Sequence, residues 1–226
     1  MNTPNPYIAA IDDQVNARRM LSHPFYQSWT AGTLTREALA DYAKQYYHHV
    51  AAFPTYLSAV HTNTEDGDTR RHILANLVDE EAGNPNHPEL WLRFAEGVGV
   101  NREDVKDADL WNETRKLVGT FRAICRDGGT ADGLAALYAY ESQIPAVAES
   151  KIEGLRKHYG LQEARALAYF DVHIEADKAH AAVEQKLLER YVNETNAPEV
   201  NKSVGSVLDA LWEMLSGVER RHPLAA

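Results

Sequence analysis

Glycine and proline residues divide this chain into long stretches of helix-forming residues, and no other feature restricts its fold as strongly. No segment of strand length shows β-branched and aromatic residues alternating with polar ones. The spacing of the apolar residues predicts helices at about 6–22, 35–63, 68–82, 88–98, 102–126, 131–158, 161–193 and 198–219. We expect one all-α domain over residues 1–226, a bundle of about seven to eight helices. Its first few residues are expected to be disordered, and the tail from His222 to Ala226 to be frayed.

The composition argues against several classes of protein. The chain has 33 acidic and 23 basic side chains, a formal net charge of −10, which disfavours a broad surface for nucleic acid. Cys125 is the only cysteine, so we expect an inert thiol in a reducing compartment rather than a disulfide framework. No apolar run approaches the roughly 20 residues of a membrane span, and the first residues lack a signal-peptide pattern. We therefore expect a cytoplasmic protein with no membrane partner.

Charged side chains interrupt the apolar stripe of the helix predicted at 161–193. Steps of four and three residues trace the inward face of this helix, yet the middle of that face holds His173, Asp177 and His180. At about 100° per residue, these three side chains lie within roughly 60° of one another. Two imidazoles and a carboxylate therefore point into the same space, which favours a metal site over a solitary core histidine.

Two further segments repeat this anomaly. Glu141 lies in the middle of the apolar stripe of the helix predicted at 131–158. An isolated buried carboxylate is costly, so Glu141 must be paired, protonated or bound to a cation. Earlier in the chain, Glu80 and Glu81 both adjoin apolar neighbours, and periodicity alone does not separate them. His87 follows at the start of the next predicted helix.

Together these residues form a candidate dinuclear metal site. Imidazole with carboxylate suits iron or manganese, and the absence of thiolate ligands argues against structural zinc. Three carboxylates would offset three of the four charges of two divalent ions. The candidate ligands are Glu80 (or Glu81), His87, Glu141, His173, Asp177 and His180. Glu184 continues the stripe about 6 Å beyond His180, so we expect an ion-paired or solvated residue there, and we expect His48 and His49 to be packing or surface residues.

The chain resembles the haem-oxygenase-like di-iron proteins in one set of motifs. These are His173-x3-Asp177-x2-His180, Tyr140-Glu141, and Glu80 followed by His87-Pro88-Glu89-Leu90-Trp91. Within that superfamily the chain is most similar to the relatives of the chlamydial protein associating with death domains, which are often described as similar to the pyrroloquinoline-quinone synthesis protein C. The resemblance covers nearly the whole chain, including His23-Pro24-Phe25-Tyr26. It implies a haem-oxygenase-like helical domain. In the comparison that it implies, ligand-type residues occupy all six ligand positions, and the ligand position before His87 corresponds to Glu80 rather than Glu81.

The resemblance also implies an activity. Such relatives are implicated in making para-aminobenzoate for folate by an oxygen-dependent route, in which a tyrosine of the protein is excised as the ring source and a lysine provides the amino group. The matching positions are Tyr26 and Lys151. The protein would then be a single-turnover, self-sacrificing oxygenase with two iron ions, or one iron and one manganese. Its expected partners are O2, an electron donor and a second copy of the chain in a homodimer. Tyr138, Tyr140 and Tyr169 are candidates to line the pocket.

Lys151 is difficult to place from the sequence. It follows Glu141 by ten residues, which is about 15 Å along an ideal helix and roughly 80° around it. Only a break near Pro145, which lacks the N–H for a helical hydrogen bond, would bring Lys151 close to Glu141. From the residues alone, a solvated surface lysine is an equally good interpretation of Lys151, and Tyr26 is equally well a core aromatic.

Other functions stay open at this point. The metals could act repeatedly on an external substrate, such as an amino acid, an amine or a fatty acid. The same fold serves cofactorless oxidases and thiamin-salvage hydrolases, but the hydrolases use a nucleophilic cysteine in the helix corresponding to 131–158, where this chain has none. A partner-binding protein, suggested by the death-domain name, would leave the charged groups on core faces unexplained.

Overall fold

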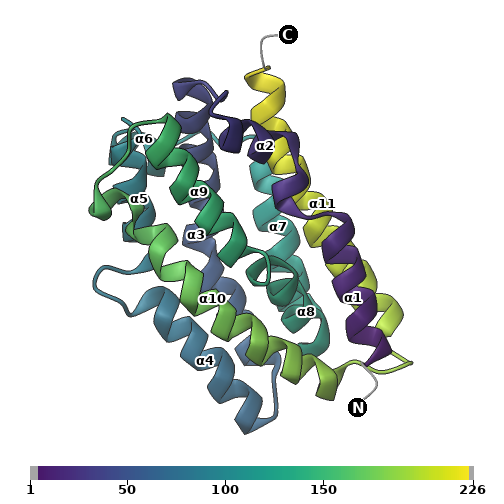
Figure 1. Ribbon diagram of the computed structural model, residues 1–226. Helices are drawn as coiled ribbons and strands as arrows, with labels where there is room; N and C mark the ends of the chain where they lie inside the picture. Colours follow the sequence, from purple (N-terminus) through teal and green to yellow (C-terminus); the bar gives the residue numbers. More distant parts are fainter. Residues whose placement is uncertain (1–4, 224–226) are drawn as a thin grey trace.

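The computed structural model describes residues 5–223, which fold into helices without a β-strand (Figure 1). The all-α prediction is therefore confirmed for this part of the chain, whereas the expectations for the first four and the last three residues lie outside it. The helices are α1 (Pro6–Ala17), a 3-10 turn η1 (Met20–Ser22), α2 (Pro24–Ala31), α3 (Arg36–Asn63), α4 (Gly67–Glu81), α5 (His87–Gly97), α6 (Arg102–Lys106), α7 (Asn112–Asp127), α8 (Thr130–Glu141), α9 (Ile144–His158), α10 (Ala164–Tyr191) and α11 (Ala197–Arg221).

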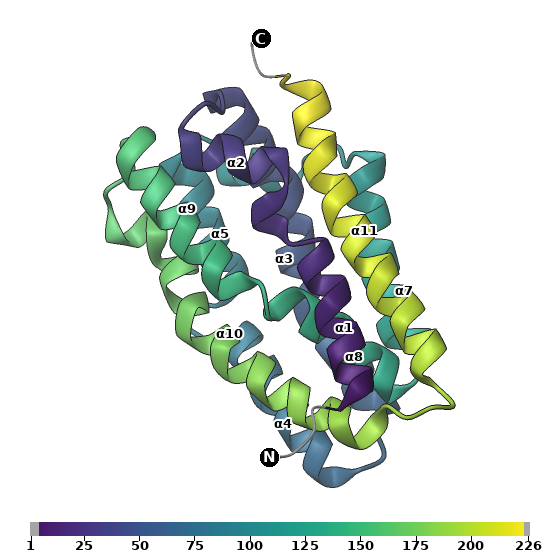
Figure 2. The ribbon, with the colours of Figure 1, turned by 45° about the vertical axis from the view of Figure 1, so that its right-hand side comes forward.

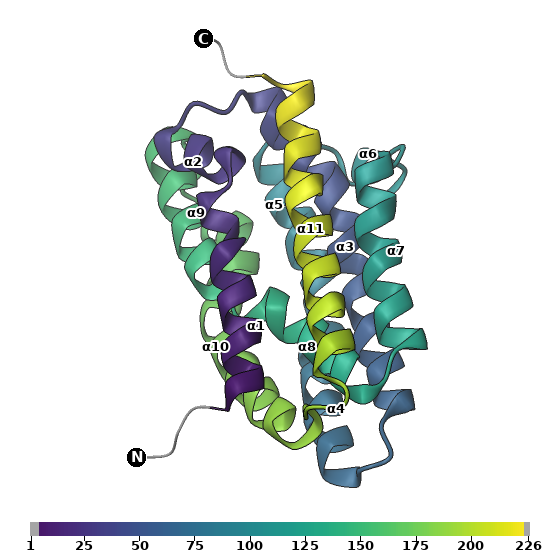
Figure 3. The ribbon, with the colours of Figure 1, turned by 90° about the vertical axis from the view of Figure 1, so that its right-hand side faces the viewer.

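Two long helices, α3 and α10, organise the bundle. Helix α3 packs against α4, α5 and α7, while α10 packs against α5, α8 and α9. Helix α11 runs beside α7 and α8, and α1 lies along it (Figure 3). The space between α3 and α10 is closed by α4, α5 and α8, so side chains from these five helices converge on it.

The segment predicted as one helix at 131–158 is two helices, α8 and α9, with a break at Ser142-Gln143 (Figure 2). Pro145 lies in the first turn of α9, where its missing N–H is tolerated. The Gln143 side chain secures the break, because its Oε1 accepts from Met20 N at 2.8 Å and its Nε2 donates to the Ala139 carbonyl at 2.8 Å. This break allows Glu141 and Lys151 both to point into the bundle.

Two other predicted helices also divide. The segment 6–22 forms α1 and η1, and the segment 102–126 forms α6 and α7 with a loop between them. The side chain of Gln45, which is buried on α3, forms hydrogen bonds with backbone groups of that loop that would have backbone partners in a continuous helix. It donates to the Asp109 carbonyl at 2.9 Å and accepts from Trp111 N at 3.0 Å and from Thr114 Oγ1 at 2.7 Å. A tertiary contact thus overrides local helix propensity.

The spacing of apolar residues did not predict helix α2. His23 caps it, since its Nδ1 accepts from Phe25 N at 3.0 Å, and Gly32 ends it at a φ of 72°. Proline at the first helical position and glycine just beyond the last are the signals that mark it. Helix α2 matters for the site because it carries Tyr26 into the core.

No helix among residues 5–223 is long and apolar enough to cross a bilayer.

Candidate metal centre

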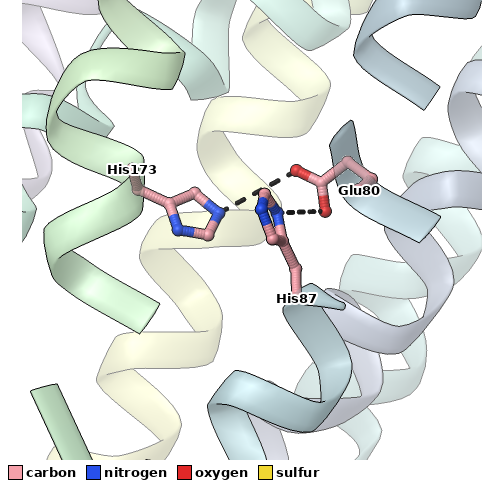
Figure 4. A group of neighbouring side chains, drawn as sticks. All are labelled: Glu80, His87 and His173. Atoms are coloured by element: carbon pink, nitrogen blue, oxygen red, sulfur yellow. Dashed lines mark ion pairs between the residues drawn. The ribbon is translucent and has the colours of Figure 1, made fainter. Parts of the chain in front are cut away.

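Glu80, His87 and His173 form the first group of ligand-type side chains (Figure 4). They come from the last turn of α4, the first residue of α5 and the middle of α10. His87 Nδ1 is 2.9 Å from Glu80 Oε2, and His173 Nε2 is 3.9 Å from Glu80 Oε1. His173 Nδ1 donates to the Tyr169 carbonyl, so its Nε2 carries a free lone pair toward Glu80.

Glu141, Asp177 and His180 form the second group. Glu141 is the last residue of α8, and the other two lie one turn apart on α10. His180 Nδ1 is 3.4 Å from Glu141 Oε1 and 3.6 Å from Asp177 Oδ1, while its Nε2 faces Asp79 Oδ2 at 3.1 Å. Asn76 of α4 donates to Glu141 Oε1 at 3.0 Å.

A small cavity connects the two groups. Its volume of about 10 Å³ is near that of one water molecule, and it is lined by Val50, Phe53, Glu80, Tyr140, Glu141, Tyr169, His173 and Asp177. Ligand-type residues of both groups therefore face one space. Of the three tyrosines expected at the pocket, Tyr140 and Tyr169 line this cavity. Tyr138 does not, because its hydroxyl donates to Asp12 at 2.7 Å on the other side of α8.

The electrostatics of this region fit a cation. Both oxygens of Asp177 are buried without a hydrogen-bond partner among residues 5–223. Burial, followed by the nearby charge of Glu141, raises the pKa of Asp177 well above its usual value. Burial alone would lower the pKa of His180, but the neighbouring carboxyl groups of Asp177 and Glu141, whose oxygens lie 3.6 and 3.4 Å from its Nδ1, outweigh burial and raise the pKa to about 11. A proton held on His180 thus supplies positive charge that a divalent ion would otherwise supply.

The structure distinguishes Glu80 from Glu81. Glu80 is buried and faces His87, whereas Glu81 is exposed to solvent. Burial raises the pKa of Glu80, and the hydrogen bond with His87 opposes this shift. The expectation for Glu184 is wrong in one respect: the side chain is buried rather than solvated, with 5% of its surface exposed. The spacing of residues within α10 did not predict this burial, because the burial results from the packing of α8 against α10 at this turn.

Lys151 and Tyr26 lie together in a second part of the core. The surface interpretation of Lys151 is wrong, since its side chain is buried and its Nζ donates to the Tyr42 hydroxyl at 2.6 Å. The same hydroxyl is 3.3 Å from the Tyr26 hydroxyl. Lys151 Nζ lies 5.0–5.9 Å from the centroids of six aromatic rings, those of Tyr26, Trp29, Tyr42, Tyr46, Trp91 and Phe170. Burial lowers the pKa of Lys151 to about 7.

Phenol side chains link this cluster to the cavity. The rings of Tyr42 and Tyr46 are 5.2 Å apart, and the Tyr46 hydroxyl donates to the Tyr140 hydroxyl at 3.0 Å. Tyr140 lines the cavity between the two ligand groups. Tyr26 is therefore connected to the candidate metal centre through Tyr42, Tyr46 and Tyr140. Sequence patterns could not reveal this chain of contacts, because its members come from α2, α3 and α8.

The remaining candidates lie away from the ligand groups. His49 is fully buried among aromatic rings and is a packing residue, as expected, and half-buried His48 faces the Val105 carbonyl at 3.1 Å. Cys125 is buried, and burial raises the pKa of its thiol to about 12, which fits an inert side chain.

A helical bundle whose core holds two adjacent sets of imidazole and carboxylate side chains has the architecture of dinuclear-metal helical proteins. A family model described as an iron-containing redox enzyme matches residues 40–212. The chain belongs to this haem-oxygenase-like family, and a metal cofactor is therefore part of the protein.

Individual relatives agree with this family. The chain is 46% identical to a 4-aminobenzoate synthase of Chlamydia pneumoniae over 93% of each chain. It is 42% identical to a 4-aminobenzoate synthase of Nitrosomonas europaea over 96% of this chain and 93% of that one. A crystal structure of a TenA homologue from Pseudomonas syringae shares the fold with a TM-score of 0.82, at 18% identity over 95% of this chain and 91% of that one.

Proposed function

We propose that the chain forms 4-aminobenzoate from its own Tyr26, that Lys151 provides the nitrogen, and that a dinuclear metal centre and O2 provide the oxidising power. The similarity to 4-aminobenzoate synthases over more than nine-tenths of the chain supports the product. The observation that carries the proposal for these residues is the single Tyr42 hydroxyl, which contacts both the Lys151 amine and the Tyr26 phenol.

The surroundings of Lys151 support its role as a nitrogen donor. An amine attacks carbon only as the neutral base, and a pKa of about 7 leaves a large neutral fraction near neutral pH. Its hydrogen bond to Tyr42 and the surrounding rings hold Nζ 5.5 Å from the centroid of the Tyr26 ring. Burial also excludes bulk water, which would otherwise compete as a nucleophile.

The product determines which bonds must change. In 4-aminobenzoate the amino and carboxyl groups are para to each other, as are the phenol oxygen and Cβ of tyrosine. Formation from Tyr26 therefore requires a C–N bond at Cζ in place of the phenol oxygen. It also requires cleavage of Cα–Cβ, oxidation of Cβ to a carboxyl group by O2, and oxidative cleavage of Cε–Nζ in Lys151. The atoms balance if the phenol oxygen leaves as water, Cα takes a hydrogen in place of Cβ, and Cε becomes an aldehyde, with O2 as the oxidant and the external donor supplying the electrons that reduce its remaining oxygen to water. One chain can consequently make one product.

The six candidate ligands would hold the metals as two groups of three. Glu80, His87 and His173 would hold one ion, and Glu141, Asp177 and His180 the other. When bound, such a centre supplies electrons for the activation of O2. Tyr140 lines the cavity between the groups and accepts a hydrogen bond from Tyr46, so the chain of phenols provides a path for protons and electrons toward Tyr26.

Isotope labelling tests the source of the product atoms. Protein made with ring-13C6 tyrosine and Nζ-15N lysine is loaded with iron and manganese and then exposed to O2 and a reductant. We expect 4-aminobenzoate whose mass is raised by six ring carbons and one nitrogen. Unlabelled product formed by the labelled protein would refute the proposal.

One variant and a matched control test the role of Tyr26. Tyr26→Phe keeps the ring but lacks the phenol, and we expect it to form no product while it still binds metal. Tyr159→Phe, a half-buried tyrosine beside Trp29 with no contact to the ligand groups, is the matched control and should form normal amounts. Undiminished product from Tyr26→Phe would remove Tyr26 from the reaction.

Metal identity and partners are part of the same proposal. Imidazole and carboxylate ligands suit both iron and manganese, so we propose either two iron ions or one of each. Elemental analysis after anaerobic loading should give about two ions per chain, and His173→Ala should lose at least one. An external electron donor and a homodimer remain predictions, which product formation with and without a reductant and sedimentation equilibrium will test.

An external substrate is the second candidate function, and one observation favours it. An apolar pocket of about 170 Å³ adjoins the second ligand group, with Asn76, His180 and Glu184 among its lining residues and leucine, isoleucine, valine and alanine side chains around them. A small molecule bound there would lie beside the metals. Repeated turnover with an added amine or fatty acid would favour this alternative over a self-sacrificing reaction.

A further inference from the structure

We propose that Asp79 is a positioning residue of the metal centre, which holds the His180 imidazole so that its Nδ1 faces the second ion. Asp79 lies outside both groups of ligand-type side chains. The proposal rests on the metal site of the proposed function, but it does not depend on which product is formed.

The two ring nitrogens of His180 have different surroundings. Nδ1 is buried without a hydrogen-bond partner among residues 5–223, and it lies 3.4 Å from Glu141 Oε1 and 3.6 Å from Asp177 Oδ1. Nε2 instead faces Asp79 Oδ2 at 3.1 Å, which is hydrogen-bond distance. A neutral imidazole binds a metal through one nitrogen and donates a hydrogen bond from the other. The second ion would therefore bind Nδ1, and Nε2–H would donate to Asp79.

His173 of the first group provides a comparison on the same helix. Its Nδ1 donates to the Tyr169 carbonyl one turn earlier on α10, and its Nε2 faces Glu80 (Figure 4). Each imidazole thus has one nitrogen directed at its ligand group and the other held by an acceptor. The acceptor for His173 belongs to α10 itself, whereas Asp79, the acceptor for His180, comes from α4. The orientation of His180 therefore depends on the packing of α4 against α10.

Helix α4 supports the second group without contributing a ligand to it. Asp79 contacts His180, and Asn76, one turn earlier, donates to Glu141 Oε1 at 3.0 Å. The residue after Asp79 is Glu80, which belongs to the first group. The exposure of these adjacent carboxylates agrees with different roles, since 58% of the Asp79 side chain is exposed and only 5% of the Glu80 side chain. Asp79 is therefore a hydrogen-bond acceptor at the edge of the centre, and Glu80 is a candidate ligand inside it.

An ordinary surface ion pair is the alternative interpretation of the contact between Asp79 and His180. Exposed ion pairs contribute little to stability, and such a pair would have no effect on metal affinity. Carboxylates that orient a metal-binding imidazole, in contrast, commonly change metal affinity by about 10-fold to 100-fold when they are removed. Because Asp79 contacts a residue of the second group alone, its loss should weaken the second ion and leave the first.

Metal titration of the full chain tests this proposal. Wild type, Asp79→Ala and Asp79→Asn are titrated anaerobically with Mn²⁺ and with Fe²⁺, and bound metal is measured by elemental analysis and by the Mn²⁺ electron paramagnetic resonance signal. Asp79→Ala should bind the first ion normally and the second about 10-fold to 100-fold more weakly. Asp79→Asn should bind both ions within about threefold of wild type, because the amide oxygen can accept the hydrogen bond from Nε2–H.

Rescue by asparagine separates positioning from a general effect of charge. Glu81→Ala is the matched control, because it removes an exposed carboxylate from the same turn of α4 and should leave both affinities unchanged. The proposal is wrong if Asp79→Asn loses the second ion as Asp79→Ala does, or if Glu81→Ala weakens that ion to the same extent. Wild-type binding by Asp79→Ala would also overturn it.

The protonated nitrogen of each histidine gives a second test, which needs no substitution. Zn²⁺ is diamagnetic and accepts imidazole and carboxylate ligands, so the Zn²⁺-loaded wild type with 15N-labelled histidine is suited to nuclear magnetic resonance. Sequence-specifically assigned long-range 1H–15N correlations should show a protonated Nε2 and a metal-bound Nδ1 in His180. His173 should show the reverse, a protonated Nδ1 and a metal-bound Nε2. A metal-bound Nε2 in His180 would refute the role of Asp79 even if no variant could be purified.

Metal binding and product formation fail separately. If the titrations give the expected pattern but wild type forms no 4-aminobenzoate, the proposed product is wrong and the role of Asp79 stands. If wild type forms the product and Asp79→Ala binds both ions normally, only the role of Asp79 is wrong. If wild type binds fewer than two ions under all conditions, both the dinuclear site and this proposal are wrong.

Discussion

Replacement of Lys151 by methionine tests whether a neutral amine is buried in the core. The pKa of Lys151 is lowered from 10.5 to about 7 by burial. Between these two values the unfolded chain binds a proton that the folded chain does not, so the stability of the wild type rises with pH across this window. Each tenfold change in proton affinity is worth ~1.4 kcal/mol. Below pH 7, the burial of Lys151 therefore lowers the free energy of unfolding of the wild type by ~5 kcal/mol.

Methionine has a similar shape and no charge, so Lys151→Met does not incur this cost. Metal-free Lys151→Met should therefore have a higher free energy of unfolding than metal-free wild type. This advantage should be ~3 kcal/mol larger at pH 7 than at pH 9.5. Urea denaturation followed by circular dichroism at the two pH values measures the difference. Other titrating groups contribute equally to both proteins and cancel.

Lys157→Met is the matched control, because Lys157 is exposed on the same helix and the difference should not change with pH. If the difference for Lys151→Met were also the same at both pH values, Lys151 would not be buried as a neutral amine. The proposed attack on Tyr26 would then lose its physical basis. The variant is also expected to form no 4-aminobenzoate, although it is the more stable protein at pH 7.

Three other substitutions test the packing and the metal site. Gly154→Ala should destabilise the protein by ~1–3 kcal/mol in urea denaturation, because a Cβ there would lie 2.6 Å from Trp29 Cδ1; an unchanged midpoint would contradict this packing. Gln45→Ala should cost a similar ~1–3 kcal/mol, since it leaves buried groups of the α6–α7 loop without partners, and protection of that loop from hydrogen exchange should fall. Added Mn²⁺ should raise the melting temperature of Asp177→Asn less than that of wild type, because the substitution removes one carboxylate of the second ligand group; an equal rise in melting temperature would count against a metal ligand at position 177.

The sequence alone determined the helical class and most of the candidate ligands. Helical spacing depends on 3.6 residues per turn, so charged side chains on an apolar stripe can be recognised without coordinates, as at His173, Asp177 and His180. The same logic identified Glu141. It failed to separate Glu80 from Glu81, because both adjoin Leu77 in a helix and only the approach of α5 and α10 buries one of them.

The tertiary structure decided the rest, and the physical reason is the same in each case. Lys151 reaches the core because the chain breaks before Pro145 and Gln143 secures the break through contacts with η1 and α8. Glu184 is buried because α8 packs against α10, and leucines of α8 line the same pocket as Glu184. Periodicity reports which face of a helix is buried, whereas contacts between helices, which join residues far apart in the chain, decide what that face meets.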